Sequence, residues 1–234
     1  MGKLIELDNA SFKINCRSDD RAEIIIYQDI GQASFFSDSL SAKEFNEELK
    51  KLKSSVKNID IRINSMGGDV FEGITIYNRL KQHKAKKTVY IDGMAASIAS
   101  VIAMAGDEII MSEGALMLIH SAWTVAMGNS RDFEEIIDRL VQIDDQILGI
   151  YQRKTKMDRG ELGRLIAAET VFDADEAVEL GFATSKSEQE AVIAASASSE
   201  KWLKNKPHVK NRESLIKDRV SNFKKEIESF LARN

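Results

Sequence analysis

The sequence has one cysteine, Cys16, and one proline, Pro207, among its 234 residues. A single cysteine cannot form a disulfide within the chain, and the cysteine and histidine residues do not have the spacing of metal ligands. No glycine-rich loop matches a nucleotide-binding motif. We therefore expect no internal disulfide, no metal and no cofactor.

Long apolar runs are also missing. Asp107 and Glu108 interrupt the most hydrophobic region, so no segment reaches the roughly 20 apolar residues of a membrane-spanning helix. The first residues, MGKLIELDNASFK, lack the basic, apolar and small-residue segments of a signal peptide. These absences predict a cytoplasmic protein with no membrane contact.

Charge is distributed unevenly along the chain. The formal net charge is -4, yet residues 201–234 hold ten Lys or Arg against four Asp or Glu, a net of +6. The basic residues alternate with apolar ones, and the segment has no array of aromatic residues on which bases could stack. Nucleic acid is therefore not an expected partner.

Strand-like and helix-like segments alternate through most of the chain, which predicts an α/β fold with right-handed crossovers. Short β-branched or apolar runs predict strands at residues 21–31, 58–65 and 88–93, and two more around a turn at Glu113 and Gly114. Apolar residues at helical spacing, or runs of small residues, predict helices at 41–53, 68–84, 95–106, 130–156, 158–168 and 173–180.

The predicted helix at 130–156 is longer than average, and its apolar residues predict one packed face. They are Phe133, Ile136, Ile137, Leu140, Ile143, Ile147 and Ile150. The pattern does not distinguish packing on the protein's own core from packing on a partner.

A change of composition near residue 189 divides the chain. We expect a main domain at 1–188, an Ala/Ser-rich linker at 189–211 and a basic amphipathic helix at 212–234. The helix carries an apolar stripe over about two heptads. This stripe suits docking on the protein's own core and contact with an oligomer or another partner about equally.

Histidine limits the chemistry that a serine can perform, because a hydroxyl needs a nearby base to become a nucleophile. His83 and His208 lie among lysines, where cations disfavour a protonated imidazole. His120 ends the apolar run ALMLIH, so we expect it at the end of a strand. A purely structural histidine is the alternative interpretation.

Ser97 lies among small residues where a predicted strand meets a predicted helix. Free N–H groups at such a junction favour negative charge, so the N–H of Ile98 could bind an oxyanion. In INSMGGDV, Gly67 and Gly68 would let a second N–H approach a ligand. Close helix packing around Ser97 and an ordinary turn at the glycines are the alternatives.

Together, the motifs NSMGG, GMAAS, LMLIH and ADEAVELG resemble the ClpP family of serine peptidases over residues 22–184. The resemblance implies that Ser97 is the nucleophile and His120 the base, with oxyanion donors at Gly68 and Ile98. It places the third member of the triad at Glu169, where the family usually has Asp. Asp173 is the alternative.

The family resemblance also implies a ClpP/crotonase-type fold of repeated β-β-α units, with the helix at 130–156 as a projecting handle. It implies a homo-oligomeric heptameric ring, or a tetradecamer of two such rings, that cleaves polypeptides and could be fed by an AAA+ unfoldase. A crotonase-type acyl-CoA enzyme and a catalytically inactive structural ring are the alternative functions.

Two departures from the family pattern indicate a divergent member. Met66 replaces the usual proline before the glycines, and Ser121, Ala122 and Trp123 follow His120 in place of the usual Gln-Pro. The basic C-terminal extension is similar to that of ClpP-related proteases of phages and prophages. In phages such enzymes process capsid or portal proteins during head maturation, so these proteins are possible substrates.

Overall fold

The structure is a computed structural model that describes residues 12–32 and 39–190. Contacts along the chain divide it into two units, Met1–Ser196 and Ala197–Asn234, and every described residue belongs to the first. The predicted helix at 212–234, His208, Pro207 and nearly all of the predicted linker lie outside the described residues.

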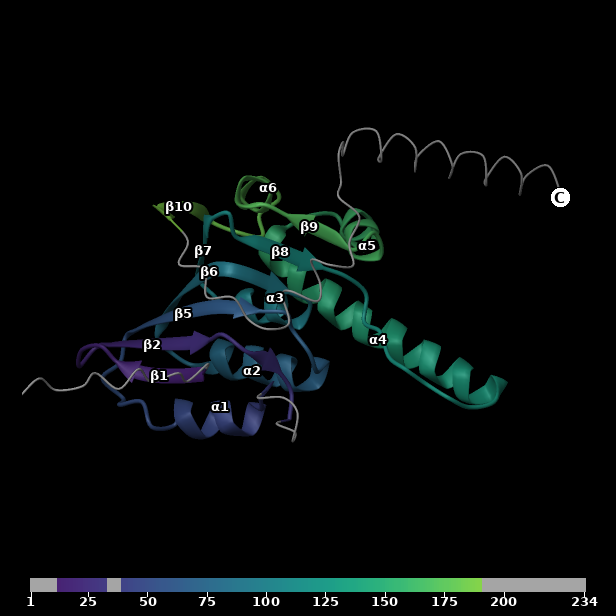
Figure 1. Cartoon of the computed structure of the whole chain (residues 1–234), viewed down its shortest axis with the longest axis horizontal. Helices are drawn as coiled ribbons and strands as arrows, with labels where there is room; N and C mark the ends of the chain where they lie inside the picture. Colours follow the sequence, from purple (N-terminus) through teal and green to yellow (C-terminus); the bar gives the residue numbers. More distant parts are fainter. Residues whose placement is uncertain (1–11, 33–38, 191–234) are drawn as a thin grey trace, which may run out of the picture. The chain divides into compact units, whose positions relative to one another are not determined.

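A sheet of eight strands forms the centre of the described part of the chain (Figure 1). Its strands are β1 (Phe12–Cys16), β2 (Arg21–Ile26), β5 (Asn58–Ser65), β6 (Lys86–Ala96), β7 (Glu108–Glu113), β8 (Leu116–Ile119), β9 (Thr170–Phe172) and β10 (Ser185–Glu190). The order is β1-β2-β5-β6-β7-β10, while β8 pairs with β6 and β9 pairs with β8. The pairs β1–β2 and β8–β9 are antiparallel and the others are parallel.

A separate two-stranded parallel pair and six helices complete the described fold. The pair consists of β3 (Asp29–Ile30) and β4 (Ser39–Leu40). The helices are α1 (Ala42–Leu49), α2 (Val70–Gln82), α3 (Ile98–Ala103), α4 (Ser130–Thr155), α5 (Arg159–Ala167) and α6 (Ala174–Glu179). No described helix is both long enough and apolar enough to cross a membrane.

Polar side chains begin five of the six helices, as expected for residues that satisfy free backbone N–H groups. Ser41, Asp69, Asn129, Asp158 and Asp173 each accept a hydrogen bond from the first turn of their helix. The sixth helix, α3, begins after Ser97, whose side chain makes no such bond. The hydroxyl of Ser97 is therefore not used as a helix cap.

Side-chain alternation along the parallel strands builds the core. In β5, Ile59, Ile61 and Ile63 are fully buried, as the period of two in a strand requires. They share one apolar cluster with Phe45 of α1 and Ile76 of α2. Burying each of these large side chains stabilises the fold by roughly 1.5–3 kcal/mol.

The residues between those isoleucines carry paired charges. Asp92 of β6, 2% exposed, forms an ion pair with Arg62 of β5 and accepts a hydrogen bond from the Tyr27 hydroxyl at 2.6 Å. Burial and the neighbouring carboxylate raise the pKa of Tyr27 to about 12, so its hydroxyl remains a donor at neutral pH. The paired groups tie β5 to β6 and both to Tyr27, the residue that follows β2.

The eleven-residue strand β6 has different neighbours along its length. Residues 88–91 pair with β7, and Met94, Ala95 and Ala96 pair with Leu116, Met117 and Leu118 of β8. The sequence pattern predicted a helix from residue 95, which is wrong. Strand pairing continues through Ala96, and α3 begins only at Ile98.

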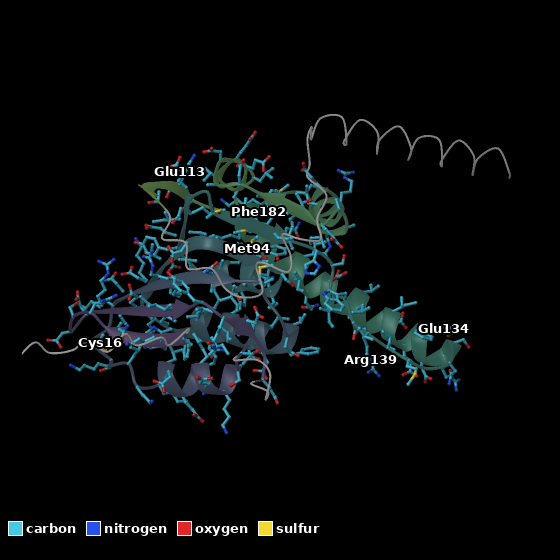
Figure 2. All side chains as sticks on the ribbon, in the orientation of Figure 1. Cys16, Met94, Glu113, Glu134, Arg139 and Phe182 are labelled. Carbon is cyan, nitrogen blue, oxygen red and sulfur yellow. The ribbon has the colours of Figure 1, made fainter. Side chains whose placement is uncertain are left out.

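The long helix α4 divides into two parts with different surroundings. Its buried residues, Ile147, Ile150 and Tyr151, lie in the C-terminal part. Of the residues predicted to pack, Phe133 is 44% and Ile137 is 58% exposed. Figure 2 shows Glu134 and Arg139 on the part of α4 that extends away from the sheet. The N-terminal part of α4 therefore presents apolar residues that its own core does not cover.

Two mid-helix glycines allow a test of the packing between α2 and α3. A Cβ at Gly73 of α2 would lie 2.2 Å from Cγ1 of the buried Ile98, whereas a Cβ at Gly149 of α4 would meet nothing closer than an Arg153 atom at 3.6 Å. Gly73→Ala should lower the free energy of unfolding by roughly 1–3 kcal/mol through overpacking. Gly149→Ala should raise it by about 0.5–1 kcal/mol through helix propensity. Urea denaturation measures both, and a shift of the same sign in the two variants would contradict the assignment.

Candidate active site

Ser97 occupies a sharp turn between β6 and α3. Its backbone has φ 53° and ψ -128°, a conformation that residues with a side chain rarely adopt. Such a conformation costs of order 1–3 kcal/mol and persists only where the surroundings enforce it. The Ser97 N–H donates to the Leu118 carbonyl of β8 at 2.9 Å, which extends the β6–β8 pairing by one residue. The turn leaves Ser97 partly exposed while its neighbours Ala96 and Ile98 are buried.

His120 follows the last residue of β8 and is partly exposed. Its Nε2 lies 2.7 Å from Ser97 Oγ, a hydrogen-bond distance. Because β8 is paired with β6, the strand that ends at Ala96 and the strand that ends at Ile119 bring these two side chains to the same edge of the sheet. The structure therefore brings together the predicted nucleophile and the predicted base.

Strand β9 lies on the other side of β8 and places the candidate acid. The two strands are antiparallel, with Ile119 opposite Thr170. One step further along this register, Glu169 lies opposite His120. Glu169 is exposed and has a left-handed φ of 49°. The backbone geometry therefore puts a carboxylate-bearing residue next to the histidine.

Asp173, the alternative acid, lies at the opposite end of β9. Its carboxylate accepts a hydrogen bond from the Glu176 N–H at 2.9 Å, and the Glu176 carboxylate accepts one from the Asp173 N–H at 3.1 Å. This reciprocal pair is the capping box of α6. Between the two candidates, the strand register favours Glu169.

Gly67 packs directly against the serine turn. A Cβ at Gly67 would lie 2.6 Å from the Ala96 carbonyl oxygen, 2.7 Å from Ser97 Cβ and 3.1 Å from the Ile98 nitrogen. Gly67 also has a φ of 93°, which disfavours any side chain. The absence of a side chain therefore leaves open the space beside Ser97 and the Ile98 N–H.

The Gly67–Gly68 peptide is fixed by β3. The Ile30 N–H donates to the Gly67 carbonyl at 2.8 Å, and the Asp69 N–H donates to the Ile30 carbonyl at 2.8 Å. In a planar trans peptide the carbonyl and the N–H point in opposite directions, so the Gly68 N–H points away from Ile30. Within the described part of the chain, no hydrogen bond uses the Gly68 or Ile98 N–H. Both donors are therefore available to a ligand.

His83 lies away from this arrangement. It is the C-cap of α2, and its Nδ1 accepts a hydrogen bond from the Ala85 N–H at 3.2 Å. Partial burial, followed by the neighbouring Lys87 and Arg79, lowers the pKa of His83 and favours the neutral ring. The histidine therefore has a structural role at a helix end, and it is more buried than the sequence suggested.

Three residues that support the site were not predicted from the sequence. Ile30 holds the Gly67 carbonyl, Leu118 accepts from Ser97, and the Ser65 hydroxyl accepts from the Gly67 N–H at 3.1 Å. Ile30 and Leu118 act through backbone atoms, so their residue types carry no signal. Ser65 is buried beside the predicted Gly-Gly motif, and its position two residues before Gly67 was the one available indication.

Comparison with known proteins identifies the family. A model of the Clp protease family matches residues 15–189. The chain belongs to the Clp protease family. The match includes Ser97, His120 and Glu169, and it confirms both the resemblance and the fold class predicted from the sequence. Clp proteases are a family of serine peptidases.

Curated relatives in the Clp protease family are similar over part of their length. The ATP-dependent Clp protease proteolytic subunit of Deinococcus radiodurans is 29% identical over 125 residues, which are 53% of this chain and 61% of the relative. Proteolytic subunit 1 of Chlamydia muridarum is 27% identical over 156 residues, which are 63% of this chain and 81% of the relative. The corresponding Chlamydia trachomatis subunit is 26% identical over the same shares.

Crowding at Gly67 gives a test of the site in this Clp protease family member. Gly67→Ala should slow labelling of Ser97 by a fluorophosphonate roughly 10²-fold or more, because the added methyl displaces the serine turn. Gly114→Ala is the matched control, since Gly114 also has a positive φ, 77°, but no atom lies within 4 Å of an added Cβ. Intact-protein mass spectrometry over time measures both rates. Equal labelling of the two variants would contradict the geometry.

Proposed function

We propose that this Clp protease family member is a serine endopeptidase with Ser97 as nucleophile and His120 as general base. The observation that carries the proposal is the 2.7 Å contact between Ser97 Oγ and His120 Nε2. The rare backbone conformation of Ser97 supports it, because strained residues cluster at functional sites. A serine in a merely structural role would need neither feature.

In the proposed reaction, His120 Nε2 takes the hydroxyl proton as Ser97 Oγ attacks the carbonyl carbon of a peptide bond. The resulting tetrahedral intermediate collapses when the imidazolium gives this proton to the leaving amine, which breaks the C–N bond and leaves an acyl-enzyme. Water then attacks the ester with His120 again as base, and Ser97 regains its proton. No cofactor or metal takes part in this proposal.

We assign the third member of the triad to Glu169. Its place opposite His120 in the β8–β9 register supports a role in orienting the imidazole and stabilising its cation. The oxyanion of the intermediate would accept hydrogen bonds from the N–H groups of Gly68 and Ile98. Both are free of other hydrogen bonds among the described residues, and Gly67 leaves the space beside them open.

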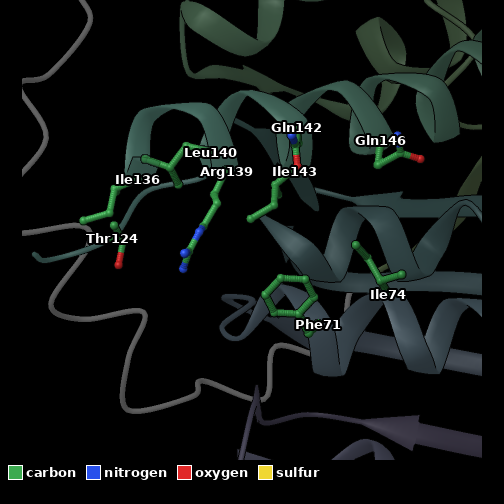
Figure 3. A pocket seen from close by; sticks show the side chains of 9 residues that line it. All are labelled: Phe71, Ile74, Thr124, Ile136, Arg139, Leu140, Gln142, Ile143 and Gln146. Carbon is green, nitrogen blue, oxygen red and sulfur yellow. The ribbon is translucent and has the colours of Figure 1, made fainter. Parts of the chain in front are cut away.

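A groove between α2 and α4 supports a peptide substrate with apolar side chains (Figure 3). Its volume is about 510 Å³. It is lined by Phe71, Ile74, Thr124, Ile136, Arg139, Leu140, Gln142, Ile143 and Gln146. Phe71 and Ile74 lie in the first two turns of α2, shortly after Gly68, and Thr124 lies four residues after His120. The groove is therefore lined in part by residues that lie close in the sequence to Gly68 and His120.

We further propose that the chain assembles into a homo-oligomeric ring through the exposed apolar residues of α4, with a cytoplasmic location. The named relatives are ATP-dependent proteolytic subunits, which supports polypeptide substrates and an ATPase partner. The relatives give no support to phage capsid or portal proteins as substrates, so the proposal stops at polypeptides in general.

The function is tested by fluorophosphonate treatment of the wild type, Ser97→Ala and His120→Ala, followed by intact-protein mass spectrometry. We expect one adduct on the wild type and none on either variant, because labelling requires both the hydroxyl and its base. Ser97→Ala should also abolish peptide cleavage. Native mass spectrometry of the same samples checks that assembly is unchanged. An unlabelled wild type in a ring-sized assembly would contradict the proposal and favour a non-catalytic ring.

A second pair of variants tests the acid. Glu169→Gln should lower kcat by up to roughly 10⁴-fold, because an amide neither stabilises the imidazolium nor fixes its tautomer. Asp173→Asn should leave kcat nearly unchanged, since asparagine also caps helices well. Steady-state cleavage of a fluorogenic peptide measures both. The reverse result would move the third member of the triad to Asp173.

A further inference from the structure

The two proposed oxyanion donors have a common construction. Each N–H belongs to a peptide unit whose carbonyl oxygen accepts a backbone hydrogen bond from another residue. The Gly67 carbonyl accepts from the Ile30 N–H at 2.8 Å, and the Ser97 carbonyl accepts from the Ser100 N–H at 3.0 Å. Because a peptide is planar, a fixed carbonyl also fixes the direction of the following N–H.

The Ser97 carbonyl has an additional side-chain donor. The Ser100 hydroxyl donates to it, and the same hydroxyl oxygen lies 2.7 Å from the hydroxyl of Tyr151. Ser100 has one hydroxyl proton, and the Ser97 carbonyl can only accept. Tyr151 must therefore donate to Ser100. The result is a directed chain of hydrogen bonds from Tyr151 through Ser100 to the Ser97–Ile98 peptide.

Burial makes this chain of hydrogen bonds stable against exchange with water. Ser100 is 0% exposed and Tyr151 is 1% exposed. The Tyr151 ring packs edge-on against Phe182 at 5.5 Å between centroids, so the position of its hydroxyl is fixed. Burial also raises the pKa of Tyr151, which keeps the phenol protonated at neutral pH. In such surroundings a hydrogen bond is stronger than in water.

A purely structural role does not explain why these hydrogen bonds lead to the Ser97 carbonyl. The helix α3 needs a bond at the Ser97 carbonyl, but the Ser100 N–H already provides it. The Ser100 hydroxyl, held by that of Tyr151, donates a second hydrogen bond to the Ser97 carbonyl. This carbonyl belongs to the same peptide as the Ile98 N–H. Without that second hydrogen bond, the peptide plane can rotate towards an ordinary backbone conformation and turn this N–H away from the oxyanion.

We propose that Ser100 and Tyr151 are positioning residues, which act through the Ser97 carbonyl to keep the Ile98 N–H directed at the oxyanion. The inference rests on the proposed function, because it assigns a supporting role within the same reaction. Tyr151 belongs to α4 and Ser100 to α3, so the orientation of one oxyanion donor depends on the docking of α4.

The proposal predicts a specific kinetic signature. The oxyanion exists only in the transition state and the intermediate, so a misdirected donor lowers kcat and leaves KM nearly unchanged. Deleting an oxyanion donor typically costs about 10²–10³-fold, and a donor that is present but misdirected should cost about tenfold or more. Affinity for a peptide boronate, whose tetrahedral adduct places an oxygen in the oxyanion site, should fall in proportion to kcat/KM.

The experiment compares Ser100→Ala, Tyr151→Phe and the double variant with the wild type as full-length chains. Kinetics on a fluorogenic peptide, boronate affinity and the melting temperature are measured on each. Tyr27→Phe is the matched control. It also removes a hydrogen-bonded hydroxyl, which donates to Asp92, but this hydroxyl is not part of the hydrogen bonds from Tyr151 to Ser97. We expect kcat to fall about tenfold or more in all three test variants and to stay unchanged in Tyr27→Phe.

The double variant separates positioning from stability. Ser100→Ala leaves the Tyr151 hydroxyl buried without its acceptor, which should lower the melting temperature. Removing both hydroxyls should restore much of this loss but none of the loss in kcat. A double variant with wild-type kcat and boronate affinity would overturn the inference. If the wild type itself neither cleaves peptides nor reacts with a fluorophosphonate, the proposed function fails instead.

Discussion

The geometry of the candidate site depends on the pairing of β8 with its two neighbours. On one side, the Ser97 N–H donates to the Leu118 carbonyl, which extends the β6–β8 pairing by one residue and holds the strained turn. On the other side, the antiparallel register with β9 puts Glu169 opposite His120. The proposed nucleophile, base and acid thus follow one another across the adjacent strands β6, β8 and β9 at one edge of the sheet. Because strand side chains alternate between faces, a shift of one residue in either register would remove a member of this set.

The candidate oxyanion site shows how backbone donors can be positioned by groups that never touch a substrate. Gly67 brings two peptides together, since an added Cβ would collide with Ser97 and approach the Ile98 nitrogen. Each peptide is then fixed through its carbonyl. For the Gly67–Gly68 peptide the donor is the Ile30 backbone, which no substitution short of proline removes. For the Ser97–Ile98 peptide, side-chain hydroxyls contribute, so sequence changes can alter this half of the site alone.

Sequence reasoning located the candidate nucleophile and base, which the structure brings within 2.7 Å of each other, but not the groups that hold them in place. Ser97 and His120 stand in motifs that combine residue type with spacing, so pattern alone reached them. Ala95 and Ala96 were placed in a helix because small residues have no period, and only the pairing with β8 decides for strand. The short strands β1, β9 and β10 were not predicted. The three residues of β9 are too few for a period, and β10, SKSEQE, has no apolar residue, whereas β1, FKINC, does alternate and was missed. The choice between Glu169 and Asp173 required a strand register. Tyr151 contributes through a hydroxyl whose partner is 51 residues away, which no local pattern reveals.

The helix α4 connects two features that are usually treated separately. Its C-terminal part docks on the core through Ile147, Ile150 and Tyr151, and the last of these contacts Ser100 behind the nucleophile. Its N-terminal part exposes Phe133 and Ile137, which belong to the proposed ring contact. Since a packed helix moves largely as one body, a neighbour that binds the exposed part also acts on the orientation of the buried part. A partner shifts this orientation only by its difference in affinity for the two arrangements. A ring contact that favours the arrangement in which the Tyr151 hydroxyl bonds to Ser100 would therefore favour an ordered oxyanion site. Assembly would then raise the catalytic rate without any contact to the substrate.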